Sequence, residues 1–208
     1  MRFTQQMVVG IVAAVLMTGI AQAEEGKPYV GFSAGAAIMD DSTLTDTFGD
    51  SAEASYSTGL SLSGVVGYAF TSGLRLEGEV NYRQADMDKL SAGGASADIS
   101  CDVSSVAVMA NAYYDFRNSS SFTPYLGFGV GFANIDAGKG TGGGFLLWES
   151  DDDTVFAYQL AVGAGIDLSR QLTLDLGYRY FTTQDPEFEL VKADYSSHNL
   201  MVGLRYRF

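Results

Sequence analysis

The chain has 208 residues, with 25 acidic residues against 12 lysines and arginines, so its net charge is −13 at pH 7. This length suits one domain, and 47% hydrophobic residues exclude a disordered chain. The acidic balance argues against a nucleic-acid partner, while one cysteine and one histidine exclude a disulfide framework and an ordinary structural zinc site; no cofactor is expected.

The first 23 residues have the parts of a secretory signal peptide. Arg2 gives a positive start, residues 7–20 are largely apolar, and Ala21 and Ala23 flank a cleavage point. A transmembrane anchor is the alternative, but it needs about 20 apolar residues. We therefore expect residues 1–23 to be a signal peptide and residues 24–208 to be the mature domain.

The rest of the chain alternates between apolar and small or polar residues, which is typical of β-strands. Eight runs show this period of two. They cover residues 29–38, 59–70, 74–83, 106–116, 125–132, 156–167, 172–180 and 199–208. The sequence therefore predicts an all-β fold with eight strands.

The connections between these runs alternate in length. Short turns fall at residues 71–73, 117–121 and 168–171, whereas long loops fall at residues 39–56, 85–100, 136–153 and 182–196. Short connections at one end and long ones at the other are typical of an antiparallel up-and-down transmembrane β-barrel.

Charge is confined to one face of the predicted strands, opposite the apolar stripe. The charged strand residues are Arg75, Glu77, Glu79, Arg83, Asp115, Asp167, Asp175, Arg179, Arg205 and Arg207. In a membrane barrel this face lines the lumen, whereas in a soluble barrel of the lipocalin kind it faces water.

Aromatic residues on the apolar stripe distinguish these two alternatives. Threading the strands up and down gathers one group at the rim with the short turns: Tyr68, Phe70, Tyr114, Phe116, Phe122, Tyr206 and Phe208. A second group gathers at the other rim: Tyr82, Phe132, Phe156, Tyr158, Tyr178 and Tyr180. Two aromatic girdles on the apolar face indicate membrane interfaces, so we expect a transmembrane barrel.

These features resemble the small eight-stranded outer-membrane barrels of Gram-negative bacteria, the OmpA-type and porin-like surface-antigen family. The resemblance covers residues 24–208 and is most specific at residues 203–208. There, Gly203, Tyr206 and the terminal Phe208 match the family's insertion signal, although the family usually has a polar residue where this chain has Met201. The resemblance implies an outer-membrane location, contact with lipopolysaccharide, and the barrel-assembly machinery as a partner during insertion.

The lumen of an eight-stranded barrel is just wide enough to be filled by side chains. We expect its five carboxylates and five arginines to form a paired ion network. Specifically, Glu77 and Glu79 are expected to meet Arg179 or Arg205 across the barrel, and Asp115 to meet Arg207. A proton or ion path, as in a small porin, is the alternative.

The long loops contain 17 of the acidic residues and only three lysines. Solvated, mutually repelling loops are one interpretation. Bridging by Ca²⁺ or Mg²⁺ to lipopolysaccharide phosphates is the other, with Glu149, Asp151 and Asp153 as the densest carboxylates. In the same loop, a glycine-rich stretch at residues 138–144 precedes the apolar residues 145–148, which we expect to pack on the barrel rim or to contact a partner.

Some barrels of this kind modify lipid A, so an enzyme is a further hypothesis. His198 is the only histidine, and its parity places it on the lipid-facing side near the outer rim, without a serine oriented toward it. Cys101 is interpreted as a small packing residue. We therefore expect a surface protein of the envelope, acting in envelope integrity or in host contact, rather than an enzyme.

Overall fold

The computed structural model describes residues 26–46, 51–92, 95–142, 145–148, 151–184, 187–188, 191–193 and 195–208. Side chains are described for residues 26–41, 55–87, 101–139, 152–184 and 195–208. The predicted signal peptide lies outside these residues. In the part of the chain that is described, no helix is long and apolar enough to cross a membrane.

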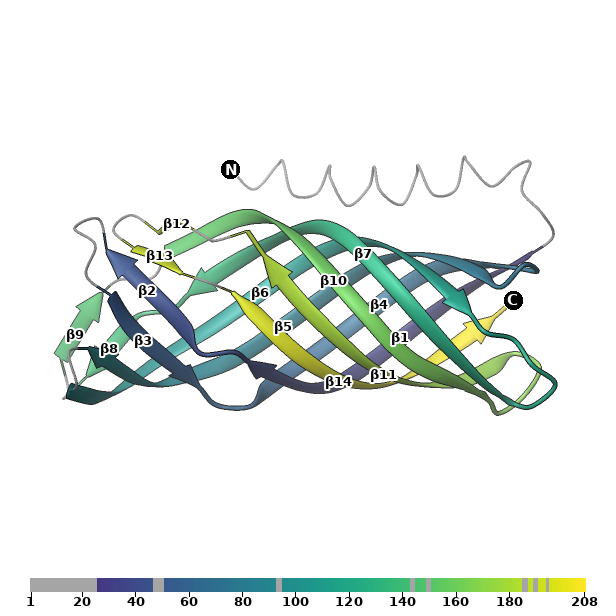
Figure 1. Ribbon diagram of the computed structural model, residues 1–208, viewed down its shortest axis with the longest axis horizontal. Helices are drawn as coiled ribbons and strands as arrows, with labels where there is room; N and C mark the ends of the chain where they lie inside the picture. Colours follow the sequence, from purple (N-terminus) through teal and green to yellow (C-terminus); the bar gives the residue numbers. More distant parts are fainter. Residues whose placement is uncertain are drawn as a thin grey trace.

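Eight long strands form a closed antiparallel barrel, as the alternation predicts (Figure 1). They are β1 (Gly26–Met39), β4 (Gly59–Phe70), β5 (Leu74–Ala92), β6 (Ala95–Asp115), β7 (Phe122–Ala137), β10 (Asp151–Asp167), β11 (Leu172–Thr183) and β14 (Ser196–Arg207). The first and last strands close the ring, with Val30 opposite Tyr206 and Ile38 opposite His198. Closure leaves no unpaired sheet edge within the ring, which is the condition for strands to cross hydrocarbon.

The end of the barrel with the long connections is more ordered than the sequence indicates. Strands β5 and β6 have 19 and 21 residues and pair as far as Ala92 and Ala95. Short strands extend the sheet on both sides of this hairpin: β2 (Ser42–Asp46), β3 (Ser51–Tyr56), β8 (Gly140–Gly142), β9 (Phe145–Trp148), β12 (Glu187–Phe188) and β13 (Val191–Ala193). The prediction of irregular loops over residues 42–46, 51–56, 85–92 and 95–100 was therefore wrong. These segments are rich in Ser, Ala and Asp, which are not typical of strands, and backbone pairing with neighbouring strands overrides this preference.

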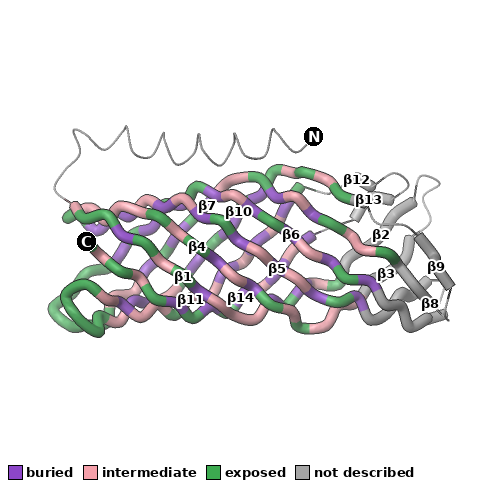
Figure 2. Tube along the Cα trace, turned by 180° about the vertical axis from the view of Figure 1, so that it is seen from behind, coloured by how far each residue is buried: buried purple, intermediate pink, exposed green. Residues whose placement is uncertain are grey.

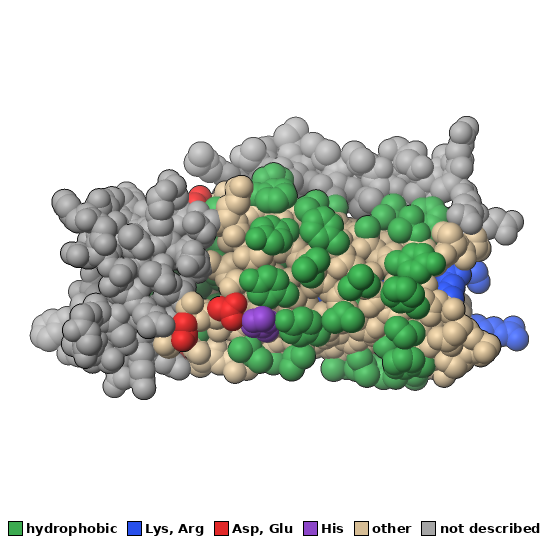
Figure 3. Space-filling view, viewed as in Figure 1, with side chains coloured by type: hydrophobic (Ala, Val, Ile, Leu, Met, Phe, Trp, Pro, Cys, Tyr) green, Lys and Arg blue, Asp and Glu red, His purple; other side chains and the backbone are tan. Residues whose placement is uncertain are grey.

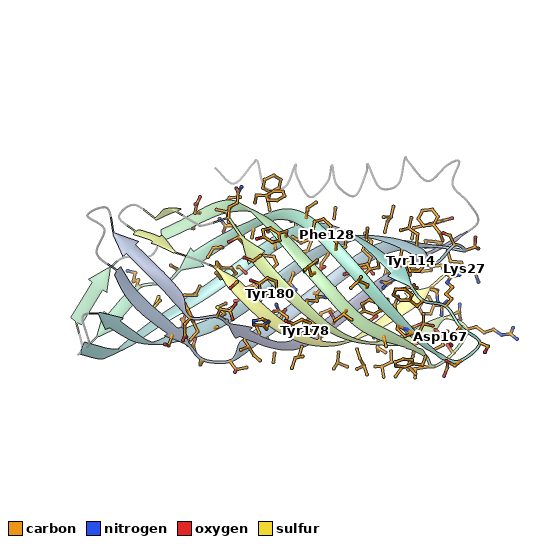
Figure 4. The ribbon with its side chains drawn as sticks, in the orientation of Figure 1. Lys27, Tyr114, Phe128, Asp167, Tyr178 and Tyr180 are labelled. Carbon is orange, nitrogen blue, oxygen red and sulfur yellow. The ribbon has the colours of Figure 1, made fainter. Side chains whose placement is uncertain are left out.

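The opposite end has three tight connections and both described ends of the chain. In the first of them, Gly73 has a φ of 95°, which suits glycine, and its carbonyl oxygen accepts a hydrogen bond from the N–H of Asp115. Figure 4 shows Lys27, Tyr114 and Asp167 near this end, and Tyr178 and Tyr180 nearer the other end. We call the two ends the short-turn end and the hairpin end.

The outer surface of the barrel is apolar, whereas its interior is polar. Phe128 and Leu204 are 50% and 47% exposed, while Glu79 is 2% exposed. Buried and exposed residues alternate along the strands in Figure 2, and Figure 3 shows apolar side chains across the barrel wall. This arrangement excludes the soluble alternative, in which the charged face would be outside.

Both predicted aromatic groups lie on the outer surface. At the short-turn end, Tyr114 packs edge-on against Phe116, and Tyr206 packs in the same way against Phe208, with ring centroids 5.1 and 5.4 Å apart. Towards the hairpin end, Phe132 and Phe156 make an edge-on pair at 5.8 Å. The apolar wall between the two girdles is the membrane-facing band.

Candidate functional site: the barrel lumen and its two ends

The lumen near the short-turn end contains two arginine–carboxylate pairs. Arg207 Nη2 lies 2.6 Å from Asp167 Oδ1, and Arg205 Nε lies 2.9 Å from Asp175 Oδ2. The hydroxyl of Tyr125 donates to the other oxygen of Asp175 at 2.8 Å. These contacts join β14 to β10 through Arg207, and β14 to β11 and β7 through Arg205 and Asp175.

Arg75 is the centre of a second group at the same end. Its Nε lies 3.1 Å from Asp115 Oδ1, and its Nη1 contacts Glu77. The hydroxyl of Tyr29 also donates to Glu77. The guanidinium carbon of Arg75 lies 4.3 Å from the ring centroid of Tyr113, at a distance suited to a cation–π contact. Arg75 is thus held by two carboxylates and by aromatic rings.

The ring of Tyr113 fits inside this narrow barrel because the neighbouring strand has no side chain beside it. A Cβ atom built on Gly127 would overlap the Tyr113 ring. The glycines that oppose the apolar stripe of β7 therefore make room for lumen side chains from other strands.

Glu79, at mid-height in the lumen, is surrounded by donors from four other strands. It accepts hydrogen bonds from Ser63 Oγ at 2.6 Å, Asn111 Nδ2 at 2.6 Å and Gln159 Nε2 at 3.0 Å, and it forms an ion pair with Arg179. Because all these groups are buried, the carboxylate relies on these donors in place of water. This cluster spans the barrel from wall to wall.

The structure places the predicted partners only partly as expected. Glu79 contacts Arg179 across the barrel, as the sequence analysis expects. Glu77 does not cross the barrel; its ion-pair partner is Arg75, two residues away on the same strand. The two side chains point into the same narrow lumen, so the local partner is nearer than any opposite one.

The predicted pair of Asp115 and Arg207 is wrong. Asp115 pairs with Arg75 of the adjacent strand, and Arg207 pairs with Asp167. The prediction placed residues by their distance from the rim alone. In a barrel the strands are tilted and staggered, so that residues equally far from the rim in sequence are not opposite each other.

Arg83 lies nearer the hairpin end than these ion pairs. It is fully buried, and among the described residues it has no carboxylate contact. Its Nε donates to Asn199 Oδ1 at 3.2 Å, and its guanidinium carbon lies 3.7 Å from the ring centroid of Phe181. Its two terminal nitrogens have no hydrogen-bond partner within the described part of the chain. Arg83 lies where the charged network gives way to a more apolar interior.

Towards the hairpin end the interior becomes largely apolar, beginning with Met109 opposite Glu79, and this change was not predicted from the sequence. A buried cluster, here called the outer plug, fills this end and contains Met39, Ala85, Met87, Cys101, Val103, Ala107, Met109, Ala133, Ile135, Ala157, Phe181 and Tyr195. The sequence does contain the signal, because apolar residues continue at inward-facing positions past the polar ones on β5, β6 and β7. Cys101 belongs to the plug, as its interpretation as a packing residue predicts.

At the level of the outer plug, the outer surface of the barrel changes from apolar to acidic. Outward-facing positions there are acidic and exposed, at Asp86, Asp102, Asp136 and Asp152. The register sets Asp86 opposite Asp102 and Asp136 opposite Asp152 on neighbouring strands. The barrel is therefore apolar outside and polar inside along its membrane-facing band, but apolar inside and polar outside at the hairpin end.

Two cavities lie in the polar half of the lumen. A vestibule of about 220 Å³ at the short-turn end is lined by Arg207, Asp167 and Asp115 among others. A second pocket of about 20 Å³ lies nearer the hairpin end and is lined by Arg75, Tyr113 and Arg179 among others. The smaller volume is about that needed by one water molecule. Neither cavity reaches the outer plug.

The carboxylates expected to bind divalent cations stay a prediction. Glu149 and the side chain of Asp151 lie outside the described residues, and Asp153 Oδ1 accepts a hydrogen bond from the N–H of Thr154 at 2.7 Å. Within the described part of the chain, no group of three or more His, Cys, Asp or Glu side chains is arranged to hold a metal ion. Residues 145–148 form β9, but their side chains also lie outside the described set.

The predicted insertion signal lies at the closure of the ring. Tyr206 and Phe208 point outwards and are 41% and 64% exposed. A Cβ atom on Gly203 would collide with Ser33 on β1, so that glycine lets the first and last strands approach closely. The N–H of Phe208 donates to the carbonyl of Pro28, extending the seam to the end of the chain.

A closed barrel with an apolar wall, two aromatic girdles and a charged interior is an integral membrane β-barrel. The chain belongs to the outer membrane protein beta-barrel domain family, whose profile matches residues 9–208. It is accordingly an outer-membrane protein.

Relatives and solved structures agree with this assignment. An uncharacterized protein of Brucella abortus is 34% identical over 182 residues, covering 74% of this chain and 57% of the relative. The outer membrane protein PagN of Salmonella typhimurium is 30% identical over 115 residues, covering 48% of each chain. The chain thus spans about half the length of these curated relatives. OprG of Pseudomonas aeruginosa has the same fold, with a TM-score of 0.63 at 14% identity, covering 89% of this chain and 97% of OprG.

Proposed function

We propose that the protein is a closed surface barrel that acts through its hairpin end, in envelope integrity or in contact with a host or another surface. The observation that carries this proposal is the double obstruction of the lumen. A buried ion network fills its middle, and the apolar outer plug fills the hairpin end. The vestibule lies at the short-turn end, and among the described side chains neither cavity continues into the outer plug, so a small porin is the less well supported function.

Conductance tests the closed lumen directly. In planar bilayers, the mature protein refolded in detergent is expected to give no steady conductance, because an ion would have to cross both the Glu79 cluster and the outer plug. The same sample should show a heat-modifiable gel band, which demonstrates that the barrel is folded. A general porin added to the same bilayer is the positive control. Steady openings by the folded protein would contradict the proposal.

The hairpin end supports a role in surface contact because it projects ordered, acidic structure beyond the apolar band. Replacing residues 42–56, which contain β2 and β3, by a short turn is expected to reduce adherence of cells that display the protein to epithelial monolayers. The barrel ring does not include these strands, so heat-modifiability should be retained. Unchanged adherence with a folded, displayed variant would exclude this hairpin as the contact surface.

Lipid A modification is poorly supported by the geometry around the only histidine. Ser196 Oγ donates to Asp40 Oδ2 at 2.6 Å, and His198 contacts Asp40 and Tyr178. The serine is therefore paired with the acid and not with the imidazole base that would activate it.

Insertion by the barrel-assembly machinery is the remaining part of the proposal. Deleting Phe208 is expected to leave most of the chain unassembled in cells, since it removes an exposed terminal aromatic residue and its backbone contact to Pro28. Phe116→Ala is a matched control, because Phe116 is an exposed aromatic residue at the same rim but lies far from the terminus. The measurement is the fraction of heat-modifiable protein in outer membranes. Equal losses in both variants would refute a specific terminal signal.

A further inference from the structure

Exposed basic side chains lie around the short-turn end of the barrel. Lys27 lies near the start of β1, Arg117 in the second turn and Arg170 in the third turn. All three are exposed, and we call them the basic rim. None of the three turns contains an acidic residue. Figure 3 shows lysine and arginine side chains, in blue, next to the apolar surface at this end.

The carboxylates at this end are paired with arginines of the lumen. Asp115 is buried and pairs with Arg75, and Asp167 lies 2.6 Å from Arg207. Within the part of the chain that the structure describes, the rim has no other acidic side chain; residues 24–25 lie outside that part. The basic rim therefore adds three positive charges to an end whose described carboxylates are already neutralised.

Arg117 lies between the other two residues of the basic rim. Its Nη2 donates to the carbonyl of Phe70 at 2.7 Å, and the residue before Phe70 is the register partner of Lys27. A backbone hydrogen bond of 2.9 Å joins the end of the Arg117 turn to the residue before the third turn, where Arg170 lies. The three positive charges thus follow one continuous arc of the rim.

Aromatic side chains of the girdle lie beside this arc. Phe116 precedes Arg117 and is 52% exposed. Lys27 lies opposite the residue between Tyr68 and Phe70, whose rings form an edge-on pair 5.0 Å apart. Such a girdle marks the level of the membrane interface, and long basic side chains at this level reach the lipid headgroups.

Position and charge together define the ligand of the basic rim. The short turns of an outer-membrane barrel face the periplasm, where the membrane leaflet consists of phospholipids. We propose that the basic rim binds the headgroup phosphates of anionic phospholipids in this leaflet. The opposite end of the barrel is acidic on its outer surface and repels the same headgroups. The inference requires only that the barrel is embedded in lipid, so it stands or fails separately from the proposed surface role.

Lipid retention measures the inference. The folded barrel is placed in nanodiscs containing equal parts of phosphatidylglycerol and phosphatidylcholine with the same acyl chains, and the lipids that remain bound after release are counted by native mass spectrometry. We expect phosphatidylglycerol to be retained in preference, because both lipids carry a phosphate but only phosphatidylglycerol has a net negative charge. Lys27→Gln and Arg170→Gln are each expected to lower this preference about fivefold.

Matched variants separate the basic rim from general surface charge. Lys139→Gln removes the same charge from an exposed position at the hairpin end and should leave the preference unchanged. Arg117→Gln should lower the preference, whereas Arg117→Lys keeps the charge and should retain it. Heat-modifiability shows that each variant is folded.

Three results would overturn the inference. The first is equal retention of the two lipids by the unmodified protein. The second is an unchanged preference in the folded double variant with Lys27→Gln and Arg170→Gln. The third is an equal loss of preference in Lys139→Gln, which would assign the effect to the total charge of the protein and not to the basic rim.

Discussion

Replacing Arg179 by methionine is expected to lower the free energy of unfolding of the barrel by about 3–5 kcal/mol. The substitution leaves Glu79 ionised in the middle of the lumen without its cation. Ser63, Asn111 and Gln159 would still donate hydrogen bonds to it. They carry no charge to offset the cost of burying a carboxylate. The measurement is urea-induced unfolding in lipid vesicles, followed by the heat-modifiable gel band.

Two controls test whether the unpaired Glu79 carboxylate causes the loss of stability. Adding Glu79→Gln to Arg179→Met should recover most of the lost stability, because a neutral amide keeps hydrogen bonds without a buried charge. Arg170→Met, in an exposed turn at the short-turn end, should change stability little. An equally large loss in the double variant would show that Arg179 stabilises the barrel through packing and not through charge.

Phe181→Ala is expected to lower the free energy of unfolding by about 3–5 kcal/mol through loss of packing in the outer plug. Phe181 is fully buried; its ring lies under the guanidinium of Arg83 and packs edge-on against Tyr195, with centroids 6.1 Å apart. Its removal leaves a cavity and strips Arg83 of its aromatic contact. The same unfolding measurement applies.

Phe128→Ala is the matched control for this second substitution. Phe128 is 50% exposed on the membrane-facing wall, so its truncation leaves lipid chains in contact with the site and opens no internal cavity. The loss should be clearly smaller than that of Phe181→Ala. The Phe181→Ala barrel should also stay non-conducting, because the Glu79 cluster still obstructs the lumen. Similar losses at both positions would argue against a tightly packed plug.

The period of two was sufficient to predict the strands and their faces. Residues 59–70 were predicted as one strand and form β4 with the same bounds. Side-chain parity decides which residues share a face, so Arg75 and Glu79 are placed on one face and Phe128 on the other by local sequence. The two aromatic girdles then show that the face with Phe128 is the outer one.

Pairing across the lumen was not predictable in the same way. The partner of Asp115 depends on the stagger between strands, and stagger is set by the closure of the whole ring. The outer plug was missed for another reason. Met87 and Cys101 lie in segments that look like loops by composition, and their inward position becomes evident only when the strands are known to continue past the membrane-facing band.

The continuation of β5 and β6 beyond the girdle has a thermodynamic consequence for any encounter at the cell surface. From Tyr82 to Ala92, β5 runs for roughly 30 Å at about 3.3 Å per residue, paired with β6. A partner that meets a paired hairpin does not have to immobilise a fluctuating coil, which costs about 1–2 kcal/mol for each residue ordered. For such a partner, much of the entropic penalty of recognition is therefore already met when the barrel folds.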